Sequence, residues 1–184
     1  MINPKDFLPD LETDLSTDQI TDSVEIYRDK WGIPHIVAKN EHDLFFAQGF
    51  SIAQDRLFQM DLDRQRCLGR SSEYLGKKAI YDDKLNVKRD FERVAKSDLN
   101  KASDSAKEMI TSFTKGVNFY ITSTEVFPME YKLMEKKPEL WEDWHSILVY
   151  KIRNAAEGSF NGKLFYSQLS NEIGAENAAK LIPG

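Results

Sequence analysis

The side chains of this sequence that could do chemistry begin with a set of arginines and aspartates: Arg28, Asp29, Asp55, Arg56, Arg64 and Arg66. An arginine stays protonated at neutral pH and cannot act as a general base. Asp55 and Arg56 stand side by side on a largely apolar segment, where ion pairs and hydrogen bonds to the backbone or to a second chain explain them better than catalysis. The sequence therefore favours structural roles for these charges and predicts no catalytic residue.

The three histidines and the single cysteine give no metal or nucleophile site. His35, His42 and His145 lack the i, i+4 spacing that a helical zinc site favours, and Cys67 alone supports neither a disulfide nor a thiolate cage. His35 lies between Pro34 and Ile36, so we expect a hydrogen-bonded core histidine, and we expect Cys67 to be a small buried apolar residue. The sequence also lacks a G-x-S-x-G, a phosphate-binding loop and a dinucleotide fingerprint. Its chemistry is incomplete.

Composition indicates a globular chain with few obvious macromolecular ligands. The 184 residues carry a net charge of −5 with 41% hydrophobic and 30% charged residues, so no clustered basic patch for nucleic acid is expected. No apolar run is long enough to span a membrane, and the start lacks the pattern of a signal peptide. We therefore expect either synthesis without a secretion signal or a mature form from which the signal was removed, and the location stays open between cytoplasm and periplasm or exterior.

The N-terminal part is expected to hold the only strands. Residues 1–22 contain six acidic side chains and little periodicity, which indicates an extended arm. Strand formers on both sides of a turn ending at Gly32 predict a β-hairpin over 23–38. Two strands are marginally stable alone, so another polypeptide is expected to supply the rest of a sheet.

The rest of the chain, from 41 to 184, is expected to be helical. Asn40 is placed to cap a helix of about 40 Å over residues 41–68, in which Gly49 is the weak point and a Phe-rich face forms core. Residues 77–102 are highly charged and are expected to hold only short helix or loop. Further helices are expected over residues 103–122, 141–156, 164–172 and 175–181, with a short one between Pro128 and Pro138. The fold class is α+β, mostly helical.

One stretch of about 55 residues carries specific motifs. It contains R-D-x-x-G-x-P-H-I over 28–36, G-F-x-x-A-Q-D-R-L-F-Q-M over 49–60, and G-x-x-x-E-x-x-G over 69–76. This string resembles the start of the small, α subunit of the penicillin acylase family. Two shorter segments are similar to later parts of that subunit: Pro138–Glu142 and Ile173–Pro183.

The resemblance implies an N-terminal-nucleophile hydrolase made as one precursor that cuts itself. The implied fold is an αββα sandwich built mainly by a separate β chain, which the hairpin of this chain completes. The implied nucleophile is the N-terminal Ser of that β chain, whose free α-amino group can act as base near neutral pH. The implied substrate is an acylated amine such as a penicillin, a cephalosporin or an acyl-homoserine lactone.

The resemblance also implies which residues contact the acyl group. In relatives that accept benzyl-type groups, the helix that matches the one after Trp141 carries a Met and an Arg-Phe pair. Counted without gaps from Trp141, those positions fall here on Asn154, Glu157 and Gly158. None matches, which argues against phenylacetyl specificity. Tyr150, Asn154 and Glu157 are the candidate substrate-binding residues. Some relatives bind calcium near here. Glu157, Ser159 and Asn161 offer fewer oxygens than the six to eight that calcium needs without help from the β chain, so no cofactor is expected, and a calcium site stays open but is not favoured.

Two alternatives stay open at this point. The chain could be a non-catalytic helical binding or scaffold module derived from the same domain, although an isolated chain would then expose its hairpin edges and aromatic faces. Gly184 resembles the residue before a family cleavage site, and it is equally explained as an arbitrary boundary.

Overall fold

The structure, a computed structural model, describes residues 3–157 and 160–181, and it describes only the backbone of residues 156, 157, 160 and 161. The chain divides into two compact units, Met1–Val149 and Tyr150–Gly184. The first unit contains a short 3-10 helix η1 (Pro4–Phe7), the strands β1 (Glu25–Arg28) and β2 (Pro34–Val37), and the helices α1 (Glu41–Cys67), α2 (Ser72–Leu75), η2 (Gly76–Ala79), α3 (Ile80–Arg89), α4 (Phe91–Lys101), α5 (Asp104–Ser123) and α6 (Met129–Leu133). Helix α7 (Asp143–Glu157) begins in the first unit and ends in the second, which also contains α8 (Phe160–Ile173) and α9 (Ala175–Leu181).

The hairpin has the predicted position and an antiparallel register. Ile26 pairs with Ile36 and Tyr27 pairs with His35. The turn is closed by the Asp29 carboxylate, which accepts hydrogen bonds from the backbone N–H groups of Trp31 and Ile33 at 2.8 and 3.0 Å. Gly32 adopts a φ of +77°, a left-handed conformation that favours glycine. The α+β expectation, a helical chain led by a hairpin, is confirmed.

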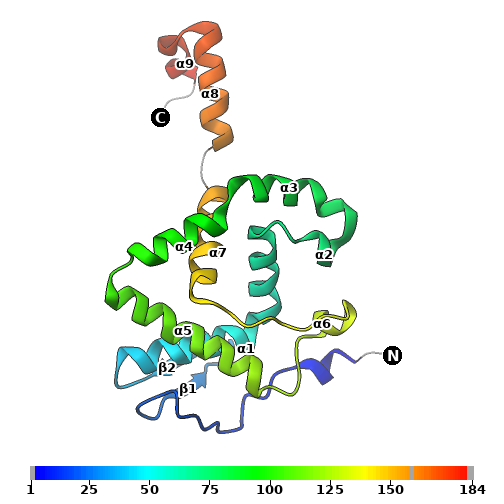
Figure 1. The fold of residues 1–184 in the computed structure, drawn as a ribbon, viewed down its shortest axis with the longest axis vertical. Helices are drawn as coiled ribbons and strands as arrows, with labels where there is room; N and C mark the ends of the chain where they lie inside the picture. The colour runs from blue at the N-terminus through cyan, green and yellow to red at the C-terminus, as the bar shows by residue number, and fades with distance from the viewer. Residues whose placement is uncertain (1–2, 158–159, 182–184) are drawn as a thin grey trace. The chain divides into compact units, whose positions relative to one another are not determined.

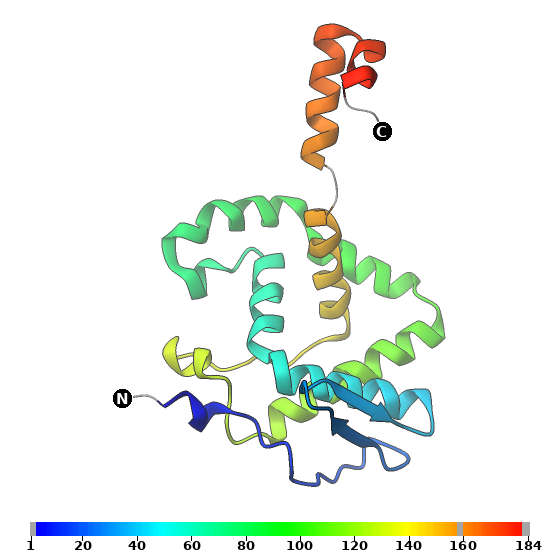
Figure 2. The same ribbon diagram turned by 180° about the vertical axis from the view of Figure 1, so that it is seen from behind.

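Helix α1 starts as predicted but is not one straight rod. Asn40 caps it, because its side-chain oxygen accepts from the backbone N–H of Asp43 at 2.8 Å. Arg56 has a non-helical backbone (φ −140°, ψ 19°), and the two halves of α1 meet there at an angle in both views (Figures 1 and 2). The expectation of a continuous 40 Å helix is wrong at this residue.

The first half of α1 packs directly on α5 at a pair of glycines. A Cβ atom on Gly49 would collide with the carbonyl oxygen of Phe113, and one on Gly116 would collide with the carbonyl oxygen of Phe46. The two backbones therefore approach as closely as the absence of side chains permits. Gly49, which the sequence presents as a weak point of the helix, is the residue that lets α1 and α5 lie side by side, as Figure 1 shows.

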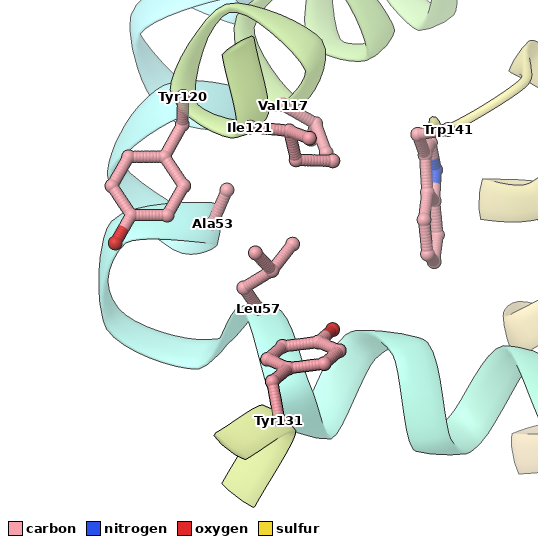
Figure 3. Packing of buried hydrophobic residues seen from close by; sticks show 7 residues of the cluster. All are labelled: Ala53, Leu57, Val117, Tyr120, Ile121, Tyr131 and Trp141. Carbon is pink, nitrogen blue, oxygen red and sulfur yellow. The ribbon is translucent and has the colours of Figure 1, made fainter. Parts of the chain in front are cut away.

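The main apolar core lies between α1, α5, α6 and the segment before α7. Figure 3 shows Leu57 between Tyr131 on one side and Val117 and Ile121 on the other, with the Trp141 ring beside them. Phe50 and Phe58 pack around this core, as the Phe-rich face of α1 predicts, and Phe113 of α5 joins them. Cys67 is buried, also as predicted.

Residues 77–102 are more helical than the sequence analysis expected. They form η2, α3 and α4, and Asp90 joins α3 to α4 in a left-handed conformation (φ +52°). The Asp83 carboxylate accepts from the backbone N–H groups of Ser71 and Ser72 at 2.9 and 2.7 Å. The apolar residues of α4 do recur at helical spacing, at Phe91, Val94, Ala95 and Leu99. The many charged residues between them make this periodicity hard to recognise.

The second unit is a helical pair. Gly174 separates α8 from α9 with a φ of +85°, as the break at this glycine predicts. Ala178 of α9 is fully buried. None of the helices described in either unit is long and apolar enough to cross a bilayer.

Candidate functional site

The predicted substrate-binding residues lie on the C-terminal part of α7. Tyr150 is 64% exposed and Asn154 is also exposed. Tyr150, Asn154 and Glu157 follow one another at i, i+4 and i+7, so the helix places them along one side. The side chain of Glu157 lies outside the described residues, as do the proposed acyl position Gly158 and the calcium candidate Ser159. Of the three predicted substrate-binding side chains, the structure describes those of Tyr150 and Asn154.

A buried polar cluster lies where the second half of α1 meets α2, α6 and the segment before α7. Asp61 is its centre: one carboxylate oxygen accepts from Arg64 at 2.6 Å, and the other accepts from the hydroxyls of Tyr74 and Tyr131, each at 3.1 Å. Gln65 donates to Asp61 as well, at 3.2 Å. Sequence analysis assigned Arg64 a structural ion pair, and this is what the structure shows. It missed Asp61, whose only signal is its i, i+3 spacing to Arg64.

The tyrosines of this cluster are held as hydrogen-bond donors. Burial, followed by the Asp61 charge, raises the pKa of Tyr74 to about 12 and raises the pKa of Tyr131 further. Both hydroxyls therefore stay protonated at any physiological pH. Asp61 is the acceptor for all four neighbours, so its carboxylate holds α1, α2 and α6 together.

Arg64 also holds the segment that leads into α7. Its guanidinium donates to the carbonyl oxygens of Leu140 at 2.9 Å and Glu139 at 3.4 Å, and it lies over the Trp141 ring at 5.1 Å. His145 is the third residue of α7, and its Nδ1 accepts a hydrogen bond from the backbone N–H of Glu142 at 2.8 Å. Burial, followed by the charge of Arg64, lowers the pKa of His145 to about 3. The imidazole is therefore neutral and serves the helix start.

The signature charges near the hairpin bind one another across elements. Arg28 pairs with Asp55 at 2.8 Å and donates to Gln54 and to the Gly32 carbonyl, each at 2.9 Å. These contacts attach the hairpin to the middle of α1, which confirms a structural role. Asp55 pairs with Arg28 across 27 positions, and its sequence neighbour Arg56 is instead the residue at which α1 bends.

His35 lies elsewhere than predicted. Its side chain is 45% exposed, it lies 3.4 Å from Asp29, and its ring stacks on Tyr27 with centroids 5.0 Å apart. The expectation of a core histidine is wrong, because the strand alternation turns Tyr27 and His35 to the outer face of the hairpin.

This outer face is unusually apolar for an exposed surface. Its large side chains are more than half exposed, and Trp31 reaches 77%; they are Tyr27, Trp31, Ile33 and Val37. Exposed apolar side chains gathered in this way are typical of an interaction surface.

The N-terminal arm, residues 3–22, is joined to the start of α1 by the buried carboxylate of Asp43. That carboxylate accepts from the backbone N–H groups of Thr21 and Asp22 at 3.0 and 2.8 Å, from the Asn40 amide at 2.7 Å, and from His42 Nδ1 at 2.9 Å. Burial alone would raise its pKa, but these donors hold the pKa of Asp43 well below its ordinary value. The Asp43 carboxylate therefore anchors the arm to the start of α1.

The described residues contain no reactive constellation of their own. Within 3–157 and 160–181, no three His, Cys, Asp or Glu side chains gather closely enough to hold a metal ion. Cys67 is buried against the Leu148 carbonyl at 3.6 Å. What these residues offer is a set of surfaces and anchors.

Comparison with known proteins gives this arrangement its context. The sequence pattern described as Penicillin amidase matches residues 23–184, which is most of the chain. The chain belongs to the penicillin amidase family. It is 41% identical over 174 residues to a penicillin acylase 2 proenzyme of Pseudomonas sp. (strain SE83), covering 95% of this chain and 22% of that protein. It is 28% identical over 166 residues to an acyl-homoserine lactone acylase of Pseudomonas syringae pv. tomato, covering 89% of this chain and 20% of that protein.

The solved structures of the family share the fold. The thermostable penicillin G acylase from Alcaligenes faecalis matches with a TM-score of 0.66 at 24% identity, over 86% of this chain and 88% of the matched chain. The chain spans about a fifth of the length of the curated relatives it matches. The sequence-based assignment to this family is confirmed.

Proposed function

We propose that this chain is the small, non-nucleophile subunit of an amidohydrolase that cleaves an N-acyl amide bond, and that the nucleophile is the N-terminal Ser of a companion β chain from the same precursor. The observation that carries the proposal is the extent of the match: 95% of this chain aligns with a penicillin acylase proenzyme, yet it accounts for 22% of that protein. The match to a solved acylase chain of similar extent adds support, since 88% of that chain is covered.

The hairpin supports a companion chain. A sheet of two short strands is marginal in water, and its outer face carries Tyr27, Trp31, Ile33 and Val37 exposed. Further strands added to this hairpin would form one layer of an αββα sandwich, whose other layers the companion supplies. A stand-alone scaffold would leave this aromatic face and both strand edges open to aggregation.

The division of labour follows from the chemistry. A free α-amino group with an ordinary pKa near 7.7–8.0 can take the proton of its own hydroxyl at neutral pH, so the companion needs no histidine from this chain. The histidines of the described residues are engaged elsewhere: His145 accepts from the backbone, His42 contacts the buried Asp43 carboxylate, and His35 contacts Asp29 on the hairpin. This chain contributes binding surface, with Tyr150, Asn154 and Glu157 as the residues proposed to contact the acyl group.

The substrate class is an acylated amine. One relative is named for penicillin and another for acyl-homoserine lactone, and both names denote removal of an acyl group from nitrogen. Asn154 and Glu157 stand where benzyl-accepting relatives have other residues, so we propose a preference for acyl groups other than phenylacetyl.

The test begins with the full reading frame. Expression should yield this chain together with a second chain, and N-terminal sequencing of the second should return Ser. Replacing that Ser by Ala should abolish hydrolysis of a panel containing phenylacetyl, glutaryl and linear acyl amides. A single soluble species that has no second chain and no activity on the panel would favour the scaffold alternative.

Two tyrosine variants test the acyl-binding residues. Tyr150→Ala should raise the KM for the best acyl substrate about tenfold, because an aromatic wall of the pocket is lost. Tyr81→Ala is the matched control, since Tyr81 is 79% exposed on α3, and its KM should stay within about twofold. Equal effects of the two substitutions would remove Tyr150 from the proposed pocket.

A further inference from the structure

A groove of about 720 Å³ lies between the N-terminal arm, β1 and the first half of α1. Its floor is aromatic and comes from two helices: Phe46 and Phe50 from α1 and Phe119 from α5. The ring centroids of Phe119 lie 5.7 Å from Phe46 and 5.8 Å from Phe50, in tilted contact. Because the glycine crossing fixes α1 against α5, this floor is a rigid apolar surface.

The arm crosses the groove as a strap that is attached near both ends. The buried Asp43 carboxylate holds the backbone of Thr21 and Asp22, and Gln54 donates to the Asp10 carbonyl at 2.9 Å. Asp43 and Gln54 are about 16 Å apart along α1 at 1.5 Å per residue. The arm uses the same number of residues between its attachments, enough to reach about 36 Å if extended. The arm is therefore longer than the distance between its two attachment points requires, and the groove lies between the arm and α1.

The two attachments differ in strength. The Asp43 end is a fully buried carboxylate with four donors. Among the residues that the structure describes, the Asp10 end is held only by exposed or partly exposed contacts, namely one hydrogen bond from the Gln54 amide and, three residues earlier, the Lys132 ammonium over the Phe7 ring at 5.4 Å. The strap can therefore lift at Asp10 while Thr21 and Asp22 stay in place.

The arm gives the groove an acidic wall. Asp10, Glu12 and Asp14 line it, and neither Glu12 nor Asp14 forms an ion pair with any residue that the structure describes. The nearby cation, Arg28, is already bound to Asp55. Leu11 and Leu15 on the same wall are each 52% exposed. The groove is thus lined by aromatic side chains on the side of the helices, which is its floor, and by carboxylates on the side of the arm, which is its rim.

We propose that this groove receives a segment of the companion part of the precursor, an apolar segment flanked by lysine or arginine, which threads beneath the arm. The inference rests on the proposed function in that it takes the occupant from the same precursor. The charge of the rim selects a basic sequence, and the aromatic floor selects apolar side chains. A ligand that contacts both the phenylalanine floor and the exposed Leu11 and Leu15 must be large, which favours a polypeptide over a small molecule.

A photo-crosslinker at the rim identifies the occupant. Leu15 is replaced by p-benzoylphenylalanine in the full-length precursor, and crosslinked peptides are identified by mass spectrometry before and after processing. The expected product joins Leu15 to a downstream peptide that contains Lys or Arg beside apolar residues. Crosslinks confined to this chain, crosslinks between two copies, or no crosslink at all would overturn the proposal.

Charge reversal provides a second test with a matched control. Glu12→Lys with Asp14→Lys should weaken retention of the companion chain about tenfold at low salt, and the difference should shrink as salt rises. Asp82→Lys with Glu125→Lys makes the same change in net charge at two exposed residues that do not line the groove, and it should alter retention by less than twofold. Equal effects of the two pairs would overturn the proposal.

These outcomes separate the inference from the proposed function. A downstream crosslink in a precursor that never processes or hydrolyses an amide would keep the groove assignment and remove the enzyme assignment. An active, processed enzyme whose Leu15 crosslinks only within this chain would do the reverse.

Discussion

The two halves of α1, on either side of Arg56, hold their neighbours by different means. The first half packs on α5 through bare backbone, with Gly49 and Gly116 allowing the closest approach. The second half is held through a buried charge, since Asp61 and Arg64 join α2, α6 and the segment before α7. Close backbone packing tolerates no added atom, and a buried ion pair tolerates no lost partner. The same helix therefore carries two kinds of sensitivity, and each can be tested by substitution.

The largest effect is expected in the second half. Arg64→Met should lower the free energy of unfolding by about 3–5 kcal/mol, because it leaves the Asp61 carboxylate buried without its cation and frees two backbone carbonyls. Urea unfolding measures the change. Arg66→Met is the control, since Arg66 is exposed on the same turn, and it should change stability by less than about 0.5 kcal/mol.

The glycine crossing of the first half should be nearly as sensitive. Gly116→Ala should cost about 2–3 kcal/mol or more, because the new methyl group meets the carbonyl oxygen of Phe46 and the helices must separate. Gln48→Ala on the exposed side of α1 is the control and should be neutral or slightly stabilising. A neutral Gly116→Ala would show that the helices have room to move apart, contrary to the close packing described above.

The anchor of the arm is the third point of comparison. Asp43→Asn should cost about 1–3 kcal/mol, because the donors of Thr21 and Asp22 lose a charged acceptor. The folded pKa of Asp43 is depressed, so its contribution is complete above the ordinary carboxyl pKa and is lost as pH falls through the lower folded value. Hydrogen exchange at the Thr21 and Asp22 amides should accelerate in the variant while exchange at the α1–α5 crossing should not. Uniform acceleration would contradict a local anchor.

His145 should make the stability of the chain depend on pH. The folded pKa of His145 is lowered to about 3, so the unfolded chain takes up a proton between about pH 6.5 and 3 that the folded chain does not. The stability of the wild-type chain should fall by about 1.4 kcal/mol per pH unit more steeply in this window than that of His145→Gln. Urea midpoints at pH 6.5, 5.5 and 4.5 measure the slopes. Parallel slopes would mean that His145 takes up its proton in the folded state too.

Much of the fold was accessible from local patterns. The hairpin over 23–38, the Asn40 cap and the break at Gly174 each follow from a turn or capping residue next to a periodic run. The family assignment came from motif residues that turn out to be structural, since Arg28, Asp55 and Gly49 bind or pack elements together. The candidate acyl-binding residues came from the resemblance alone and stay a prediction.

Two of the wrong predictions have different physical causes. His35 was expected in the core because it lies among apolar residues, but strand alternation and the lack of a covering layer leave it on the outer face. The helices of residues 77–102 were missed because charge outnumbers their apolar positions, and tertiary contacts such as Asp83 with Ser71 complete them.

The family follows from motifs in the sequence. The order of the elements and the positions at which most of them begin also follow from the sequence, because caps, turns and periodicity act between residues a few positions apart. Three features become evident in the three-dimensional packing alone: which charges are buried, the close helix contact at Gly49, and the aromatic groove beside the acidic arm. Those features depend on atoms far apart in the chain, such as Gly116 against Phe46 or Thr21 against Asp43. Their distances are set by packing, which no local pattern records.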